Sequence, residues 1–263
     1  MKLNSRRIER MVKNTKVFSY DCVESTNKTA KELALNGSSE KTIVVSAQQT
    51  GGKGRLGRTF FSPKGGVYLS VILRSEMQED GILFITVAAA VAVARAIEAI
   101  SGKKCEIKWV NDIYIDGKKV CGILTEGEFN SNGGLNYAVL GVGINLFAPK
   151  GDFPSNLPLA DSVFNKRDKI LLKKRVKEQL VSEFVNAFFE YYQNLDQKSF
   201  MQAYKDKSFL TGKEITYTKG EKTYSGTVVG IDDNAHLIVN FDGREVALSH
   251  GEIQIIGMEQ PAV

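Results

Sequence analysis

The pattern of apolar positions along this chain of 263 residues changes near residue 210. Before that point, short apolar runs alternate with stretches of helical periodicity, which predicts strands mixed with helices. After it, short strand-like runs are separated by turn residues, which is typical of a small β-barrel-like unit of about fifty residues. We therefore expect an N-terminal tail of residues 1–16, an α+β unit of residues 17–209 and a small β unit of residues 210–263.

The pattern also predicts individual elements in chain order. Runs of β-branched and aromatic residues predict strands at Thr15–Tyr20, Thr42–Gln48, Val67–Leu73 and Asn136–Leu146. Helical periodicity and cap signals predict helices from Ser25 to Gly37, from Gly81 to Ser101 and from Ile170 to Leu195, with a shorter helix after the last. In the small β unit, the expected strands are Glu214–Tyr217, Tyr224–Gly230, Leu237–Phe241 and Glu245–Leu248.

The most apolar stretch, Ile82–Ile100, is rich in alanine and is interrupted by polar residues. We expect a buried core helix there rather than a membrane span. The first sixteen residues are basic but lack the apolar region of a secretory signal, so we expect a frayed or loosely docked tail. Three cysteines without a paired CxxC spacing fit free thiols in a reducing cytoplasm. A formal net charge of +5 is too weak to demand a nucleic-acid partner.

One short loop, Gln49–Arg58, packs four glycines and three cations between two strand-like runs. Glycine lets the backbone approach a ligand closely, and Lys and Arg beside backbone N–H groups bind phosphate or carboxylate. The loop therefore predicts an anionic ligand. It also imitates the dinucleotide and P-loop fingerprints, but both need a helix next, and Thr59–Gly66 carries a proline and two glycines. A mobile basic surface loop remains the alternative.

A hairpin is expected around Asp116-Gly117, because this dipeptide lies between two apolar runs. With that turn, Ile115 pairs with Lys118, Tyr114 with Lys119, and Asp112 with Cys121. The side chains that then share one face are Asp112, Tyr114, Lys119 and Cys121. An Asp and a Lys on one face suit metal–phosphate chemistry, and the alternative is a solvent-exposed salt bridge.

The strand Val139–Leu146 separates two kinds of residue by parity. Its even positions are apolar and predict a core-facing side. Its odd positions include Gly141, Gly143 and Asn145, which would leave room for a ligand with a polar group at the edge. The alternative is that the two glycines simply allow a helix to pack closely on the sheet.

Taken in order, these segments resemble the biotin protein ligases. The matching motifs are Ser25-Thr26-Asn27, the Gln49–Arg58 loop, Lys108-Trp109-Val110-Asn111-Asp112, Lys119–Leu124 followed by Glu126, and Gly141–Asn145. The resemblance spans about residues 17–257 and implies a mixed-sheet catalytic domain packed on helices, followed by an SH3-like C-terminal β-barrel. Three residues depart from the family pattern: Lys53 replaces Arg, Val110 replaces Pro and Phe60 replaces Trp. The short N-terminus leads us to expect the form without a DNA-binding domain.

The resemblance implies a reaction in two steps. Biotin and ATP would give biotinyl-5′-AMP, and biotin would then pass to a specific lysine of the biotin carboxyl carrier protein of acetyl-CoA carboxylase or a related carboxylase. Mg²⁺ would accompany ATP. Biotin and the carrier protein are thus the expected partners, without nucleic acid or membrane. A homodimer is left open, because related ligases often pair edge strands.

The resemblance also implies roles for individual residues. Lys119 and Arg55 would be catalytic, and Asp112 would hold the metal. The implied biotin-binding residues are Ser25, Thr26, Asn27, Gln49, Gly52, Lys53, Gly54, Arg55, Lys119, Gly122, Gly141 and Gly143. The implied ATP-binding residues are Arg55, Arg58, Asn111, Asp112, Lys119 and Asn145.

Three other functions compete with this interpretation. Lipoyl and octanoyl transferases share the catalytic fold but carry the acyl group on a cysteine, for which Cys121 is the candidate. A biotin-sensing co-repressor would need specific binding to DNA. A nucleotide-binding adaptor that uses its C-terminal barrel would release no pyrophosphate.

Overall fold

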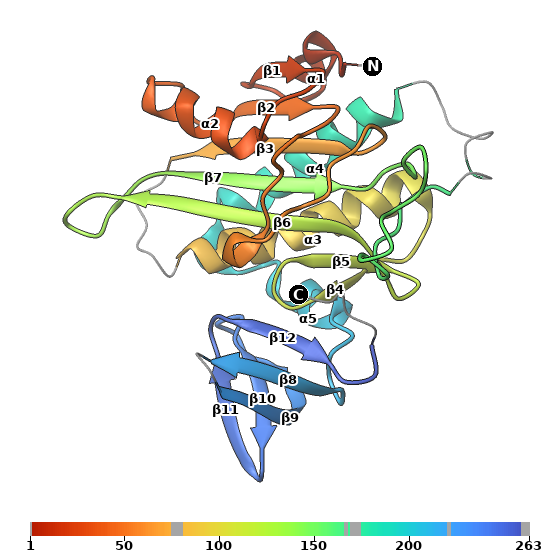
Figure 1. The fold of residues 1–263 in the computed structure, drawn as a ribbon. Coiled ribbons are helices and arrows are strands. Elements are labelled where there is room, and N and C mark those ends of the chain that lie inside the picture. The colour runs from red at the N-terminus through yellow and green to blue at the C-terminus, as the bar shows by residue number, and fades with distance from the viewer. Residues whose placement is uncertain (1, 75–80, 166–167, 169–174, 220–221, 259–263) are drawn as a thin grey trace.

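The computed structural model describes residues 2–74, 81–165, 168, 175–219 and 222–258. Its larger part is built on a seven-stranded sheet with strand order β1-β2-β3-β7-β6-β5-β4 (Figure 1). The strands are β1 (Lys16–Tyr20), β2 (Thr42–Ser46), β3 (Val67–Leu73), β4 (Glu106–Lys108), β5 (Asp112–Ile115), β6 (Lys118–Phe129) and β7 (Leu135–Ile144). The helices are α1 (Ser5–Met11), α2 (Thr26–Leu35), α3 (Gly81–Ser101), α4 (Val176–Tyr192) and α5 (Met201–Lys207).

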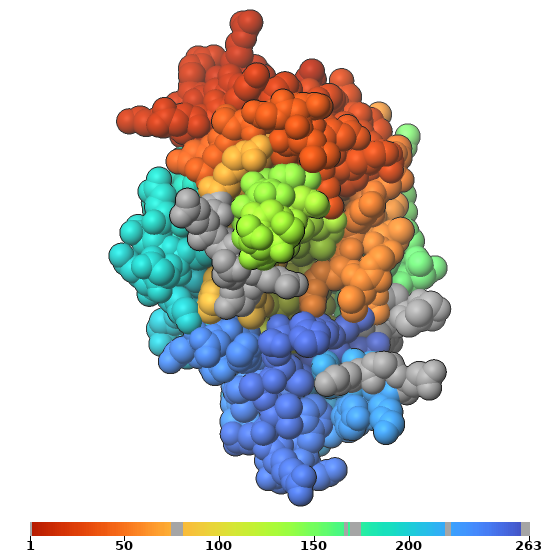
Figure 2. All heavy atoms as spheres, turned by 90° about the vertical axis from the view of Figure 1, so that its left-hand side faces the viewer, coloured from red at the N-terminus to blue at the C-terminus, as the bar shows by residue number. Residues whose placement is uncertain are grey.

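The sheet is mixed, as the family resemblance implies, because one strand pair differs from the rest. β1 and β2 pair in parallel, and α2 provides the crossover that a parallel pair requires. All other neighbours pair antiparallel. The β6–β7 hairpin projects beyond the sheet, and Figure 2 shows its green tip between the N-terminal part above and the C-terminal strands below.

One face of the sheet is covered by α3 and α4, which form the main hydrophobic core with it. The even positions of β7, from Leu140 to Ile144, belong to this core, which confirms the predicted parity. α3 is long and apolar enough to cross a membrane by length and composition, but 67% of its most apolar window is buried inside the protein. Its alanines allow close packing, so the expectation of a core helix is confirmed.

The opposite face of the sheet is covered only in part. Ala30 and Ala34 of α2 pack on Val44, Ile72 and Val139 in a small second cluster. Farther along β7, the residues on this face are glycines rather than apolar side chains. The sheet therefore offers an open area next to the N-terminal end of α2, and the candidate site lies there.

The N-terminal residues are packed, so the expected frayed tail is wrong. Leu3, Ile8 and Val12 are buried in the main core. The backbone N–H of Asn4 donates to Glu178 Oε1 at 3.0 Å, which ties the segment to α4. Its basic residues are mostly exposed and conceal the apolar side of α1, which is too short to give a clear helical period.

The chain ends in a five-stranded antiparallel sheet with order β11-β10-β9-β8-β12. Its strands are β8 (Glu214–Lys219), β9 (Lys222–Ile231), β10 (Leu237–Phe241), β11 (Arg244–Leu248) and β12 (Glu252–Ile255). The first four match predicted strands, and β12 was missed. Within the described residues, pairing runs from β11 to β12 and does not join these two edges, so the small β unit is present but barrel closure is not shown.

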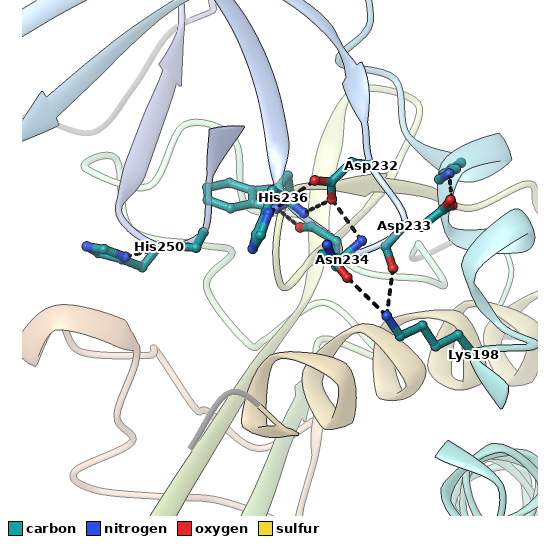
Figure 3. Close-up of polar contacts among 10 residues, drawn as sticks. Lys198, Asp232, Asp233, Asn234, His236 and His250 are labelled. Carbon is teal, nitrogen blue, oxygen red and sulfur yellow. Dashed lines mark hydrogen bonds and ion pairs between the residues drawn. The ribbon is translucent and has the colours of Figure 1, made fainter. Parts of the chain in front are cut away.

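The turn between β9 and β10 attaches this sheet to the larger part of the protein. Lys198 Nζ donates to Asp233 O and to Asn234 Oδ1, each at 3.1 Å (Figure 3). On the other side, Trp109 Nε1 donates to Ala235 O at 2.9 Å in a buried hydrogen bond. The turn after β4 is thereby fixed from the C-terminal side.

Helix boundaries agree with the prediction except around α4. The structure describes this helix from Val176 to Tyr192, and the predicted start at 170–174 lies outside the described residues. The shorter helix expected after it is α5. The expected loop Gly151–Pro158 contains no helix or strand.

The packing of α1 gives a first prediction. Ile8→Ala should lower the free energy of unfolding by about 2–5 kcal/mol, because it leaves a cavity in the core. Lys13→Ala, at an exposed position of the same segment, should change it by less than about 0.5 kcal/mol. Urea denaturation measures both values. Equal midpoints for Ile8→Ala and the parent protein would show that the segment is not docked.

Candidate functional site

The site is organised by one row of directly paired residues that crosses five strands. The partners run from Tyr68 on β3 to Gly143, Gly122, Asp112 and finally Lys108 on β4. Directly paired residues place their side chains on the same face of a sheet. We call these five residues the cross-strand row. It brings two glycines, a carboxylate and an ammonium group onto the face that α2 leaves open.

The glycines in this area are required by close neighbours. A Cβ at Gly143 would lie 2.5 Å from the Phe60 ring, and one at Gly122 would lie 3.0 Å from it. A Cβ at Gly141 would lie 2.1 Å from Asn27 Oδ1. The glycine-rich loop thus folds back over the sheet and lays Phe60 on the bare strands. The absent side chains leave room for the Phe60 ring and for Asn27, which pack against these glycines.

A β-bulge in the hairpin corrects one prediction and explains another. Asp112 pairs with Gly122 and Ile113 with Cys121, whereas Tyr114 pairs with Lys119, so Val120 has no partner on β5. The extra residue turns Lys119 toward the site and sends Cys121 into the main core. The predicted pairing of Asp112 with Cys121 is therefore wrong, while Tyr114–Lys119 and Ile115–Lys118 are confirmed.

Lys119 and Asp112 form an ion pair at the centre of the site. Lys119 Nζ lies 2.7 Å from Asp112 Oδ2. The other carboxylate oxygen, Asp112 Oδ1, is buried and has no hydrogen-bond partner among the described residues. Such an oxygen is a strong candidate ligand for a hydrated cation or a hydroxyl group. Lys119 can therefore still donate to a ligand, and Asp112 Oδ1 can still accept from one.

Arg55 and Arg58 connect the glycine-rich loop to the C-terminal sheet. Arg55 donates to Asn111 Oδ1 at 3.2 Å and to Gly251 O at 2.9 Å, and Arg58 forms an ion pair with Glu252. Burial lowers the pKa of Arg55, although a guanidinium remains charged in a protein. Two cations of the predicted anion site are thus already oriented toward the same opening.

A hydrogen-bonded network forms the other end of the site. Gln49 Oε1 accepts from the backbone N–H of Thr26 at 2.8 Å and from its hydroxyl at 3.0 Å. Ser70 Oγ lies 2.8 Å from the Thr26 hydroxyl and 2.6 Å from Asn27 Oδ1. Asn27 Nδ2 in turn donates to Glu126 Oε2 at 2.7 Å. These contacts fix donors and acceptors at the N-terminal end of α2.

These residues surround one open pocket with about 950 Å³ of empty space, part of it continuous with solvent. The predicted residues in its wall are Ser25, Thr26, Asn27, Gln49, Lys53, Gly54, Arg55, Arg58, Asn111, Asp112, Lys119, Gly122, Gly141 and Gly143. Residues that the role assignment omitted include Phe60, Lys108, Trp109, Gly251 and Glu252. Lys108 belongs to a recognised motif, whereas nothing in the local sequence connects Gly251 and Glu252 to a segment almost two hundred residues earlier.

Two predicted residues are not among the wall residues of this pocket. Gly52 shapes the loop: its carbonyl accepts from the Phe60 N–H at 2.9 Å, and a Cβ there would lie 2.5 Å from Phe60 O. Asn145 is buried, and its Oδ1 has no hydrogen-bond partner among the described residues.

The short 3-10 turn Arg55–Gly57 is followed by extended chain and antiparallel β3, so neither nucleotide fingerprint has its helix. The described residues contain no group of three or more potential His, Cys, Asp or Glu metal ligands.

The positions of the cysteines give a second prediction. Cys22 is exposed, while Cys105 and Cys121 are buried. Burial raises the pKa of Cys105 to about 12 and raises that of Cys121 well above its ordinary value. A thiol reagent should therefore label one cysteine in the native protein and all three after denaturation, as measured by mass spectrometry of peptides. Native labelling of Cys121 would contradict the bulge geometry.

Comparison with known proteins agrees with this architecture. The model of the biotin/lipoate A/B protein ligase family matches residues 19–145. The bifunctional ligase/repressor BirA of Bacillus spizizenii is 34% identical over 223 residues, which cover 83% of this chain and 67% of that protein. The biotin–[acetyl-CoA-carboxylase] ligase of Paracoccus denitrificans is 29% identical over 229 residues, which cover 85% of this chain and 94% of that protein.

A solved structure shares the fold. The biotin protein ligase from Aquifex aeolicus, in complex with biotin and ATP, superposes with a TM-score of 0.71 over 92% of this chain and 99% of the other, at 24% identity. The mixed sheet with its covering helices is thus common to both. On the sequence identity to the Bacillus protein and the family match, the chain belongs to the biotin/lipoate A/B protein ligase family.

Proposed function

We propose that this chain is an ATP-dependent biotin protein ligase, which forms biotinyl-5′-AMP and transfers biotin to a lysine of a carboxylase carrier protein. The observation that carries the proposal is the convergence of Arg55 and Lys119 on a pocket that glycines keep open. Relatives named as biotin–[acetyl-CoA-carboxylase] ligases support the reaction. The solved complex of a similar fold with biotin and ATP supports the substrates.

The first step needs neutralised charge and fixed geometry rather than a covalent nucleophile. A carboxylate oxygen of biotin attacks the α-phosphorus of ATP, and both reactants are anions. Lys119, beside Asp112, would contact the carboxylate and the α-phosphate, and Arg55 would contact the same phosphate from the loop. These cations stabilise the charge that develops in the transition state. Asn111 and Asp112 would serve the nucleotide, with Arg58 at its phosphates and Asn145 behind them.

The network at α2 would bind the polar ring of biotin. Gln49 accepts two hydrogen bonds from Thr26, and Ser70 lies within hydrogen-bond distance of both Thr26 and Asn27, so these polar groups are oriented before the ligand arrives. Ser25 lies beside them in the wall of the pocket. Gly122, Gly141 and Gly143 would leave space for the bicyclic ring and its chain, and Lys53 and Gly54 would close over it. Fixed polar groups reduce the ordering cost of binding.

Asp112 fits the role of a magnesium ligand. Asp112 lines the pocket, and its Oδ1 is buried and lacks a hydrogen-bond partner among the described residues. Mg²⁺ in phosphoryl-transfer sites is commonly held by one or two carboxylates together with phosphate oxygens and water. A single protein carboxylate is therefore sufficient, and the bound ion would neutralise phosphate charge near Lys119.

The proposal also covers the domain organisation, the cellular location and the competing transferase function. We take residues 17–209 as the catalytic unit and residues 210–263 as an SH3-like unit, because the short antiparallel strands of the latter form their own sheet. A cytoplasmic enzyme would explain the free thiols. The buried, protonated Cys121 disfavours the transferase alternative, since acyl transfer there requires an accessible thiolate.

The direct test uses purified protein with ATP, Mg²⁺ and biotin, with lipoate and octanoate as parallel acids. We expect pyrophosphate release that depends on biotin. Release with lipoate alone would contradict the choice of biotin and assign a lipoate ligase. No release with any acid would contradict the adenylating reaction itself, and the protein would then be tested as an adaptor.

Removal of either central cation gives a third prediction. Lys119→Ala and Arg55→Ala should each slow biotin-dependent pyrophosphate release at least about tenfold, because a charge-assisted hydrogen bond contributes about 1.5–3 kcal/mol. Lys118→Ala is the matched control, because this neighbouring lysine is exposed and donates to Pro158 O at 2.8 Å. Rates of both variants within about threefold of the parent would refute the assignment.

A further inference from the structure

Lys108 differs from every other cation that lines the pocket. It is the last member of the cross-strand row and is only 9% exposed, and it lines the pocket wall. Lys119, Arg55 and Arg58 each have an ion-pair or hydrogen-bond partner. Lys53, the remaining cation of the wall, is exposed to solvent. Lys108 Nζ has neither with any residue that the structure describes, although it is not sealed from the pocket. A buried ammonium without a partner is costly, so its position calls for an explanation.

The surroundings of Lys108 favour an anion from outside the chain. Burial lowers the pKa of Lys108, and the nearby charges partly cancel: Asp112 and Glu252 favour the ammonium form, while Lys119 and Arg58 oppose it. Both carboxylates are already paired, with Lys119 and with Arg58. A bound anion would therefore supply the ion pair that no described residue forms with Lys108. Lysine is suited to phosphate, which it meets as a compact charge with three donors.

The place of Lys108 in the row indicates which phosphate it would meet. The order is Gly143, Gly122, Asp112 and Lys108, so Lys108 stands two strands beyond the glycines, a displacement of about 10 Å across the sheet. In an in-line displacement, the attacking and leaving oxygens lie on opposite sides of the phosphorus. With biotin over the glycines and the α-phosphate at Lys119, the leaving phosphates point away from the glycines, toward β4.

We propose that Lys108 binds the β- and γ-phosphates of ATP, which leave as pyrophosphate. The inference rests on the proposed function. A bond forms between a biotin carboxylate oxygen and the α-phosphorus, and the bond from the α-phosphorus to the oxygen that bridges it to the β-phosphorus breaks. The electron pair stays on the departing pyrophosphate, and Lys108 keeps its proton and neutralises that charge. Lys108 then has no role once pyrophosphate has left.

This division of labour is tested by comparing ATP with biotinyl-AMP. Lys108→Met should raise KM for ATP at least about tenfold, as expected for one lost charge-assisted contact. Its affinities for biotin and for biotinyl-AMP, measured by calorimetric titration, should stay within about twofold of the parent, since neither ligand carries the leaving phosphates. Lys108→Arg should recover part of the affinity for ATP, and exposed Lys118→Met should match the parent. Equal weakening of ATP and biotinyl-AMP, or an unchanged KM for ATP, would overturn the proposal.

Inorganic pyrophosphate tests Lys108 independently of the reaction. Calorimetric titration should give a dissociation constant at least about tenfold weaker for Lys108→Met than for the parent and for Lys118→Met. If the parent releases no pyrophosphate with biotin but shows this difference, the proposed function fails while the anion site stands. Equal affinities in parent and variant would overturn the anion site. Lys108→Gln, which keeps a polar side chain, replaces the Met variant if thermal melting shows that the latter is unfolded.

Discussion

The site depends on three sheet positions that carry no side chain. Gly122, Gly141 and Gly143 are adjacent across β6 and β7. A Cβ would collide with Asn27 at Gly141 and with Phe60 at Gly143, and it would crowd Phe60 at Gly122. Elsewhere on β7, the same face carries Tyr137 and Val139, which belong to the cluster that packs on α2. The pocket therefore lies where the side chains of this partly covered face are absent. Rigid strands hold its floor, so the groups that rise around it keep fixed relative positions.

Charge is the second organising principle of the site. Arg55, Arg58, Lys108 and Lys119 all line one pocket, and two carboxylates, Asp112 and Glu252, offset part of their mutual repulsion. Such an arrangement is poorly suited to nucleophilic catalysis, and the buried Cys121 does not alter that. It is well suited to joining two anions, because the cations neutralise the charge of the reactants and hold them in a fixed orientation, which water does not do. The C-terminal sheet takes part, since Gly251 and Glu252 orient the two arginines.

Local patterns predicted the parts of the structure that depend on local chemistry. The parity of β7 and the turn at Asp116-Gly117 both follow from residue types at short spacing. The bulge at Val120 did not, because one unpaired residue shifts the alternation and leaves no mark in composition. The buried side of α1 was also missed, because the helix is short and its basic residues conceal its few apolar positions.

Contacts between distant segments were the second kind of feature that the sequence did not predict. The bond from Arg55 to Gly251 joins residues that no short-range pattern relates, so the contribution of the C-terminal sheet to the pocket required the folded chain. Lys108 was visible in a motif, but its burial and lack of an ion-pair partner among the described residues appear only when β4 is placed beside β5.

The most direct test of this account is the affinity for biotin of the parent protein and of Gly143→Ala, measured by calorimetric titration. The added methyl group would meet the Phe60 side chain at 2.5 Å rather than backbone, so the fold should survive, as thermal melting would verify. The account predicts that affinity for biotin falls at least about tenfold, because the methyl group pushes Phe60, a wall residue, out of its place in the pocket. An unchanged affinity would show that the glycine-cleared strands do not bind the ligand.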